Sequence, residues 1–257
     1  MTKIHKQYRI LSLENICDRF VHLVLDAEEL SRVSLPGQIL NVRVNDGLEP
    51  VFRRPFGIHR YNGTVGILFE VRGKGTQFLA QKKPGDMLDI LAPLGNTFTL
   101  PEPEDKNIVF IAGGIGVAPL LSLAASIEDK GRKKVLLYGC RDKGYVFDKK
   151  RAKKAGCEMH IATDDGSAGV HGNISRLFDL IPAEKDRTRV YVCGPVVMMK
   201  CVQEFARANG LRGECLCEEV MACGTGACRG CVIKTIGGYK TVCQDGPVFD
   251  LGEVVFD

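Results

Sequence analysis

The spacing of hydrophobic and polar positions divides the chain into regions with different periods. Up to about residue 100, short apolar stretches are separated by turns, as at Pro36-Gly37 and Pro84-Gly85, with little helical periodicity between them. This pattern predicts a small antiparallel β-barrel over residues 1–100. The expected elements are strands at Tyr8–Leu13, Phe20–Leu25, Ile39–Val44, Val65–Val71 and Met87–Leu91, and one helix at Gln77–Gln81.

From about Lys106 onward, apolar runs of strand length alternate with helical periods. Ile108–Ala112 is continuously apolar, which is typical of a parallel strand buried on both faces. The alternation predicts a doubly wound α/β domain over residues 101–211, after the polar, proline-rich segment 100–105. Further strands are expected at Val135–Tyr138, Glu158–Ala162 and Arg189–Val192, and helices at Val117–Ile127, Asp148–Ala155, Ile174–Leu180 and Val196–Ala208.

Residues 212–257 form a third, glycine-rich segment with almost no helical periodicity. Such a short segment cannot bury much apolar surface by itself, and a bound metal would supply the missing stability. We therefore expect a small C-terminal domain organised around metal ligands.

Composition narrows the possible classes. A chain of 257 residues with 45% hydrophobic and 26% charged residues is typical of a folded globular protein. The net charge of +4 is spread along the chain and does not favour nucleic-acid binding. The sequence shows neither an apolar secretion signal nor a run of about 18 apolar residues. We therefore expect a cytoplasmic protein without a membrane segment.

The cysteines provide the strongest chemical signal. The chain has 11, and six of them lie between Cys215 and Cys243. Four of the six follow the pattern C-x4-C-x2-C with a distant fourth cysteine, which is the plant-type ligand spacing of a [2Fe–2S] cluster. A four-cysteine zinc site usually shows two C-x2-C pairs, and Cys243 has no such neighbour. The predicted ligands are Cys223, Cys228, Cys231 and Cys243, whereas Cys215 and Cys217 are interpreted as packing residues on a strand.

Two motifs in the first region predict a flavin site. An arginine that follows a barrel strand offers a bidentate fork to a phosphate, and a Gly-Thr turn at the start of a helix offers backbone N–H groups to the same anion. An ordinary strand-end arginine and an ordinary turn would be the alternative. The candidate flavin-binding residues are Arg54, Pro55, Phe56, Gly57, Val71, Gly73, Lys74, Gly75 and Thr76.

A glycine-rich loop between a buried strand and a helix predicts nucleotide binding in the second region. The candidate residues are Gly113, Gly114, Gly116 and Pro119, joined by Cys193, Gly194 and Pro195 at the end of a later strand. Carboxyl ends of parallel strands meet at one sheet edge, so Cys193 is a candidate contact of a nicotinamide, or else a buried cysteine. Asp142 favours NAD and Arg141 favours NADP, and the choice stays open here.

The chain resembles the ferredoxin–NADP reductase superfamily, because the arginine motif, the glycine turn, the glycine-rich loop and the cysteine cluster follow one another in this order. The C-terminal runs Glu218–Cys223 and Val242–Phe249 are more particular and resemble the electron-transfer subunit of class B dihydroorotate dehydrogenase. The resemblance implies FAD in the barrel, NAD at the α/β domain and a [2Fe–2S] cluster in the tail. It also implies a heterotetramer, with two copies each of this subunit and of an FMN-containing catalytic subunit. In that family, electrons pass from dihydroorotate through FMN, the cluster and FAD to NAD, in pyrimidine biosynthesis.

Two candidate catalytic positions and a docking loop complete the expected site. The family usually has Ser or Thr, with a hydroxyl near the flavin N5, where this chain has Gly57, which offers only its backbone N–H. Cys193 is the second candidate. Small or apolar residues in the cysteine loop are expected to face the partner: Met221, Ala222, Thr225 and Ala227.

Two other functions remain open at this stage. One is an electron-transfer subunit of another complex, such as a sulfhydrogenase or an NADH-dependent NADP oxidoreductase. The other is a cluster-based redox sensor, against which the complete nucleotide loop argues.

Overall fold

The computed structural model describes residues 3–17, 19–61, 63–129 and 131–256. Contacts divide the chain into two compact units, and each is described by itself. The first unit runs to Thr97 and also contains Glu218–Ile233 and Tyr239–Val248, and the second contains the rest of the chain. The division of the tail into a domain of its own stays a prediction.

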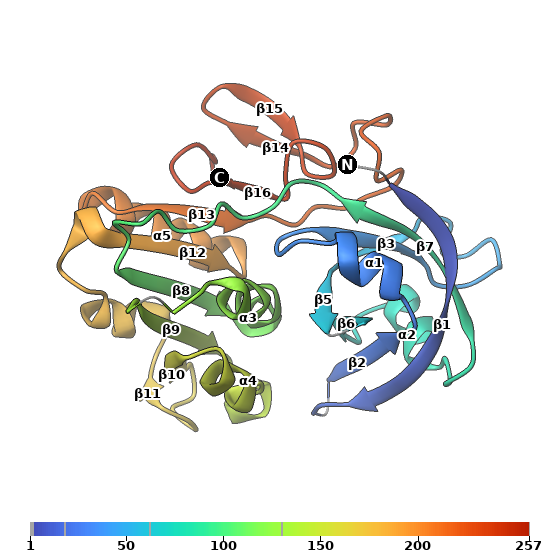
Figure 1. Cartoon of the computed structure of the whole chain (residues 1–257), viewed down its shortest axis with the longest axis horizontal. Helices are drawn as coiled ribbons and strands as arrows, with labels where there is room; N and C mark the ends of the chain where they lie inside the picture. Colours follow the sequence, from blue (N-terminus) through green and yellow to red (C-terminus); the bar gives the residue numbers. More distant parts are fainter. Residues whose placement is uncertain (1–2, 18, 62, 130, 257) are drawn as a thin grey trace. The chain divides into compact units, whose positions relative to one another are not determined.

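An antiparallel sheet that curls into a near-closed barrel forms the body of the first unit (Figure 1). Its strand order is β4-β3-β7-β1-β2-β6-β5. The strands are β1 (Ile4–Asn15), β2 (Phe20–Leu25), β3 (Ile39–Arg43), β4 (Arg54–Gly57), β5 (His59–Tyr61), β6 (Thr64–Glu70) and β7 (Met87–Leu94), with helices α1 (Glu28–Val33) and α2 (Lys74–Ala80).

The period-two alternation of the sequence fills the barrel. On β3, Leu40 and Val42 belong to the buried core, together with Leu23 and Ile67 from β2 and β6. Removing such side chains from water stabilises the fold by about 1.5–3 kcal/mol each. Successive side chains of a strand point to opposite faces, so Asn41, between Leu40 and Val42, points away from the core.

The second unit contains a sheet with the strand order β11-β10-β9-β8-β12-β13-β16 (Figure 1). Each residue of β8 is buried, and its pairs with β9 and β12 are parallel, as the apolar run predicts. The strands are β8 (Asn107–Gly113), β9 (Lys133–Cys140), β10 (Cys157–Thr163), β11 (Val170–His171), β12 (Thr188–Cys193), β13 (Arg212–Leu216) and β16 (Val248–Asp250). The helices are α3 (Val117–Ser126), α4 (Lys149–Lys154) and α5 (Val196–Ala208), with 3₁₀ turns η1 (Gly114–Gly116), η2 (Lys143–Tyr145), η3 (Ile174–Leu180) and η4 (Lys185–Arg187).

The order of these strands creates a switch point beside β8. The chain moves outward from β8 through β9 to β10, and then returns to place β12 on the other side of β8. The loops after β8 and β12 therefore diverge from neighbouring strand ends, which is where open α/β sheets bind ligands. A short hairpin, β14 (Val232–Thr235) and β15 (Gly238–Thr241), lies between β13 and β16 in the sequence.

The predicted fold class is confirmed, with differences in individual elements. The helix expected at Ile174–Leu180 is present and is of the 3₁₀ type, which the pattern did not distinguish because apolar residues at i and i+3 line one face in either helix type. Helix α2 begins three residues before the predicted Gln77. Helix α1 was not predicted, since six residues are too few for a clear period.

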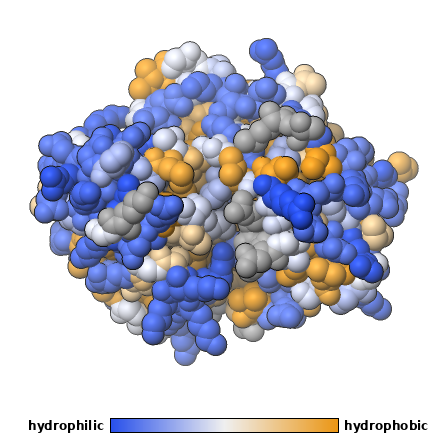
Figure 2. All heavy atoms as spheres, viewed as in Figure 1, coloured by the Kyte–Doolittle hydropathy of each residue, from blue (hydrophilic) through white to orange (hydrophobic). Residues whose placement is uncertain are grey.

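The surface agrees with the composition. Figure 2 shows one face of the molecule, on which hydrophilic side chains predominate and hydrophobic ones form separate patches. Among the described residues, no helix combines the length and the apolar character needed to cross a membrane.

A buried lysine joins two helix ends in the second unit. Lys134 is 6% exposed, and its Nζ donates to the carbonyl oxygens of Ala124 and Ile127, at the end of α3, and of Ala155, just after α4. The three distances are 3.2, 2.7 and 3.2 Å. The last carbonyls of a helix lack partners within the helix, and a cation also complements the negative end of the helix dipole.

We expect Lys134→Met to lower the free energy of unfolding by roughly 3 kcal/mol, because it leaves buried carbonyls without their charged donor. Urea unfolding of the purified chain measures the change. Lys133→Met is the matched control, since Lys133 is exposed and makes one ion pair, with Glu158 at 3.5 Å. That variant should change the free energy by no more than about 0.5 kcal/mol, and equal losses in the two variants would contradict the assignment.

Candidate functional site

The arginine motif and the glycine turn of the first unit meet. A Cβ added to Gly75 would lie 2.9 Å from Arg54 Nε, so the arginine side chain lies directly across this glycine. Arg54 Nη1 also donates to the carbonyl oxygen of Phe52 at 2.8 Å, which fixes the direction of the guanidinium group. The structure thus brings together the two halves of the predicted phosphate site.

The neighbouring arginine has a different role. Arg53 Nη2 donates to Asp89 Oδ1 at 2.9 Å, and its Nη1 donates to the carbonyl oxygen of Asp89 at 3.0 Å. Burial raises the pKa of Asp89, but hydrogen bonds from Arg53 and His5 outweigh this and hold that pKa below its usual range. Arg53 bonds to Asp89 of β7, whereas Arg54 lies against the glycine turn, so the two side chains point in different directions.

The hydroxyl group of Thr76 holds the glycine turn in shape. Thr76 Oγ1 accepts hydrogen bonds from the N–H groups of Arg72 at 2.9 Å and Gly73 at 3.1 Å, and donates to the carbonyl oxygen of Gly73 at 3.0 Å. Gly73 is the N-cap of α2. The threonine therefore shapes the turn, while Lys74 points to Glu49 in an exposed ion pair of 3.0 Å.

The remaining candidates of this site lie on or beside β4 and β6. Phe56 packs against Phe69, with 5.8 Å between ring centroids, and Pro55 lies opposite Asn41 of β3. Val71 follows β6 and is exposed. A Cβ at Gly57 would meet nothing within 4 Å, so neither space nor backbone conformation requires a glycine at this position.

In the second unit, the loops after β8 and β12 contact each other closely. A Cβ on Gly113 would lie 2.6 Å from Pro195 Cδ and 2.7 Å from Met198 Sδ, and one on Gly194 would lie 2.8 Å from the Gly113 nitrogen. Any side chain at either glycine would push these loops apart. The sequence motifs identified Gly113, Gly194 and Pro195, but not Met198.

Gly116 and Cys193 are equally close. A Cβ on Gly116 would clash with the carbonyl oxygen of Cys193 and lie 3.0 Å from its Sγ. Cys193 is only 2% exposed, and Pro119 lies in the first turn of α3. The predicted nucleotide residues therefore gather at one sheet edge, although Cys193 has little exposed surface there.

The cysteine loop presents its sulfur atoms to backbone donors. The N–H groups of Thr225 and Cys228 each approach Cys223 Sγ at 3.4 Å, and that of Gly226 approaches Cys243 Sγ at 3.2 Å. Gly230 N donates to Cys228 Sγ at 3.4 Å. Backbone N–H groups aimed at sulfur stabilise thiolates that ligate a metal. Gly224 and Gly226 have φ values of +69° and +86°, which glycine adopts at low cost.

The environments of the thiols differ within the loop. Burial tends to raise the pKa of Cys223, but the N–H donors of Cys228 and Thr225 outweigh it and lower the pKa to about 6. Burial and the neighbouring Cys231 raise the pKa of Cys243 to about 12. Two neighbouring thiols cannot both ionise at low cost unless a cation compensates their negative charges. A bound metal provides that compensation. The donor set thus fits a metal cluster.

All eleven cysteines lie among the described residues, and none forms a disulfide. Within those residues, no group of three or more His, Cys, Asp or Glu side chains is arranged to hold a single metal ion. The assignment of the four ligands therefore depends on their spacing and on the N–H···S bonds. Cys215 and Cys217 are buried at the end of β13, with their sulfur atoms 3.8 Å apart.

Sequence reasoning missed the residues that hold this loop on the barrel. Asn96 Nδ2 donates to the carbonyl oxygens of Asp245 at 2.9 Å and Val248 at 2.7 Å, and its Oδ1 accepts from Val248 N at 2.9 Å. A Cβ on Gly224 would lie 2.8 Å from Asn41 Nδ2 and 3.0 Å from Leu94 Cδ1. Neither asparagine belongs to a motif, so the sequence contains no signal for them.

One predicted member of the docking loop is wrong. Met221 is 2% exposed and packs inward, because its long apolar side chain gains more from burial than from contact with water. Ala222 is half-buried, whereas Thr225 and Ala227 are exposed.

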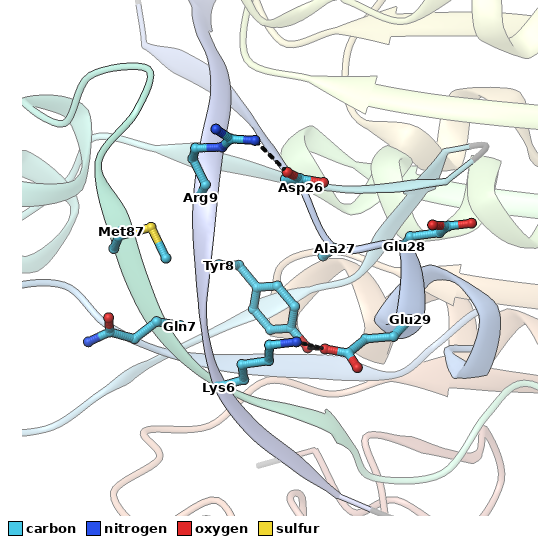
Figure 3. Close-up of a pocket in the computed structure, with 9 residues that line it drawn as sticks. All are labelled: Lys6, Gln7, Tyr8, Arg9, Asp26, Ala27, Glu28, Glu29 and Met87. Carbon is cyan, nitrogen blue, oxygen red and sulfur yellow. Dashed lines mark hydrogen bonds and ion pairs between the residues drawn. The ribbon is translucent and has the colours of Figure 1, made fainter.

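A surface hollow between β1 and α1 lies apart from all these motifs (Figure 3). Four of its charged groups pair with each other: Lys6 with Glu29 at 2.7 Å and Arg9 with Asp26 at 2.9 Å. None of the predicted site residues lines it. The hollow is therefore not the site to which the motifs point.

Comparison with solved structures defines the class of protein. The chain is 27% identical to an NADH-dependent reduced ferredoxin–NADP oxidoreductase, with a TM-score of 0.86 over 97% of this chain and 90% of that one. A ferredoxin–NADP⁺ reductase from Neisseria gonorrhoeae has a TM-score of 0.68 at 20% identity, covering 80% of this chain and 92% of that one. The chain thus has the fold of the ferredoxin–NADP reductase class.

Comparison of sequences defines the family. The model described as the iron-sulfur cluster binding domain of dihydroorotate dehydrogenase B matches residues 218–255, and that of the oxidoreductase NAD-binding domain matches residues 110–204. The dihydroorotate dehydrogenase B (NAD(+)) electron transfer subunit of Geobacillus kaustophilus is 40% identical over 254 residues, 96% of each chain. That of Desulforamulus reducens is 36% identical over 256 residues, 97% of each chain. The chain belongs to the family of dihydroorotate dehydrogenase B electron transfer subunits.

We expect Cys228→Ser to remove the iron of the purified chain and to leave its flavin bound. Cys228 is the exposed member of the four and contributes no packing to the barrel, so only the metal should be lost. Iron analysis and flavin absorbance of anaerobically purified protein measure the two contents. Cys17→Ser is the control and should retain both, and zinc in place of iron in the unaltered chain would contradict the cluster assignment.

Proposed function

We propose that this chain transfers electrons to NAD from an FMN-containing partner subunit that oxidises dihydroorotate. The electrons would pass first through a [2Fe–2S] cluster and then through FAD. The observation that carries the proposal is the position of the cysteine loop. Gly224 of that loop lies against Asn41 of β3, and Asn41 is paired with Pro55 in the flavin motif of β4. The proposed one-electron site and the proposed flavin strand are thus neighbours within one unit.

The chemistry explains why three redox groups belong in one path. A bound flavin exchanges a hydride with a nicotinamide and single electrons with a cluster, so it connects two-electron and one-electron partners. Arg54 and the turn Gly73–Thr76 would hold the flavin pyrophosphate. The flavin ring would be lined by Phe56, Gly57 and Val71. Pro55 and Lys74 would lie around the bound flavin. Cys223, Cys228, Cys231 and Cys243 would hold the cluster.

The nucleotide would bind at the switch point of the second unit. Gly113, Gly114 and Gly116 supply close backbone approach at the end of β8, and Pro119 lies in the first turn of α3 beside them. Cys193, Gly194 and Pro195 approach from β12. We propose NAD and not NADP, because the named relatives use NAD(+). Asp142 Oδ1 accepts from Gly144 N at 2.7 Å, which fixes this carboxylate after β9.

The partner follows from the family. The relatives are named as subunits, and the proposed assembly contains two copies of this chain and two of the FMN-containing subunit, in pyrimidine biosynthesis. We propose a cytoplasmic location for this assembly. Of the two other complexes considered, the NADH-dependent NADP oxidoreductase shares the fold at 27% identity, against 36–40% for the dehydrogenase subunits.

We expect Arg54→Ala to weaken FAD retention by roughly tenfold to a hundredfold, because a charge-assisted hydrogen bond contributes about 1.5–3 kcal/mol. Arg53→Ala is the matched variant, and it should retain FAD because Arg53 is engaged with Asp89. Flavin content after gel filtration, with the free flavin titrated back by fluorescence, measures both. Equal losses would assign the wrong arginine.

The complete function requires the partner. Alone, the chain should reduce dyes with NADH and show no dihydroorotate oxidation. With the FMN subunit it should support dihydroorotate-dependent NAD reduction. Thr225→Glu should abolish this coupled turnover and retain iron and dye reduction, since Thr225 is an exposed residue of the cysteine loop. Thr225→Gln, of the same size but uncharged, is the control. Coupled turnover that survives in Thr225→Glu would place the docking face elsewhere.

A further inference from the structure

Asn41 is a buried amide that the local structure does not satisfy. It lies at the centre of β3 with 0% of its surface exposed. Among the residues that the structure describes, neither its Nδ2 nor its Oδ1 has a hydrogen-bond partner. A buried amide with no partner costs about 1–3 kcal/mol, so such a group calls for an explanation.

The direction of the side chain shows which neighbour it faces. Leu40 and Val42 point into the barrel core, so Asn41 points to the outer face of the sheet. There, Gly224 covers it so closely that an added Cβ would lie 2.8 Å from Nδ2 and 3.6 Å from Asn41 Cβ.

The neighbourhood is a sulfur site that already depends on N–H donors. Gly224 follows Cys223, whose Sγ accepts from two backbone N–H groups at 3.4 Å. Arg53 Nη1 donates to the backbone carbonyl oxygen of Asn41 at 3.4 Å, and this bond does not involve the side-chain amide. The amide itself thus remains available to the cysteine loop.

We propose that the Asn41 side-chain amide donates a hydrogen bond to the sulfur atoms of the bound cluster on its Cys223 side, and so raises the cluster's reduction potential. This inference rests on the proposed function, in which the loop holds a [2Fe–2S] cluster. Hydrogen bonds to the sulfurs stabilise the reduced, more negative cluster and are among the factors that set its potential. Asn41 is a positioning and tuning residue that contacts no organic substrate.

The test is a redox titration of the cluster in the full chain, purified anaerobically with its iron and followed by the electron paramagnetic resonance of the reduced state. Asn41→Leu removes the donor and keeps the branched shape and the number of heavy atoms of the side chain. At a fixed potential, its ratio of reduced to oxidised cluster should fall about tenfold, which corresponds to about 59 mV for one electron. Asn41→His places a ring N–H at the same reach from the backbone and should restore most of the ratio.

Two further variants control for steric effects of the substitution on the cluster. Asn41→Ala removes the amide without adding bulk against Gly224, and it should shift the ratio in the same direction if Asn41→Leu holds too little iron. Leu94→Met is the matched control, because Leu94 also contacts Gly224 but offers no donor. Its ratio should equal that of the unaltered chain.

The outcomes separate this inference from the proposed function. Equal ratios and spectra in the unaltered chain, Asn41→Leu and Asn41→Ala would overturn the role of Asn41 and leave the cluster in place. A shift in the flavin potential alone would also overturn it, by showing that the amide faces the flavin. Absence of iron from the unaltered chain would instead overturn the proposed function.

Discussion

The cysteine loop depends on a surface that it does not itself build. Its residues form no helix and little core, and their shape is set where Gly224 meets Asn41 and Leu94 on the outside of the barrel. Asn96 holds the other end of the ligand segment through three hydrogen bonds. With both ends fixed, the backbone N–H groups point at the sulfur atoms without the help of a large hydrophobic core. The barrel is thus both a proposed flavin scaffold and the support of the proposed metal site.

Local signals explain what could be predicted from the sequence. Period two, buried apolar runs and cysteine spacing are properties of neighbouring residues, and they predicted the barrel, the α/β sheet and the four thiols. Asn41 and Asn96 could not be found in this way, because their contacts span more than a hundred residues and no spacing encodes them. The type of the helix at Ile174–Leu180 could not be predicted for a related reason, since its apolar positions suit both helix types.

Glycine has different meanings at different sites of this chain. At Gly113 and Gly116 the packing of β8 against the loop after β12 leaves no room for a Cβ, so the residue type follows from geometry. At Gly57 the space is open, and a side chain would fit. The absence of a hydroxyl near the flavin motif is therefore a chemical feature of this chain and not a steric necessity.

The hydrogen bonds of Asn96 also set an order of events during synthesis. They join residues 149 and 152 positions apart, so they form only after nearly the whole chain exists. Cys243 lies two residues before Asp245 and is positioned by the same docking. Contacts of such long range are slow to form, because the entropy of loop closure must be lost first. Iron that arrived at a nascent chain would meet three thiols in an unanchored loop, so the complete ligand set exists only after the tail has docked on Asn96.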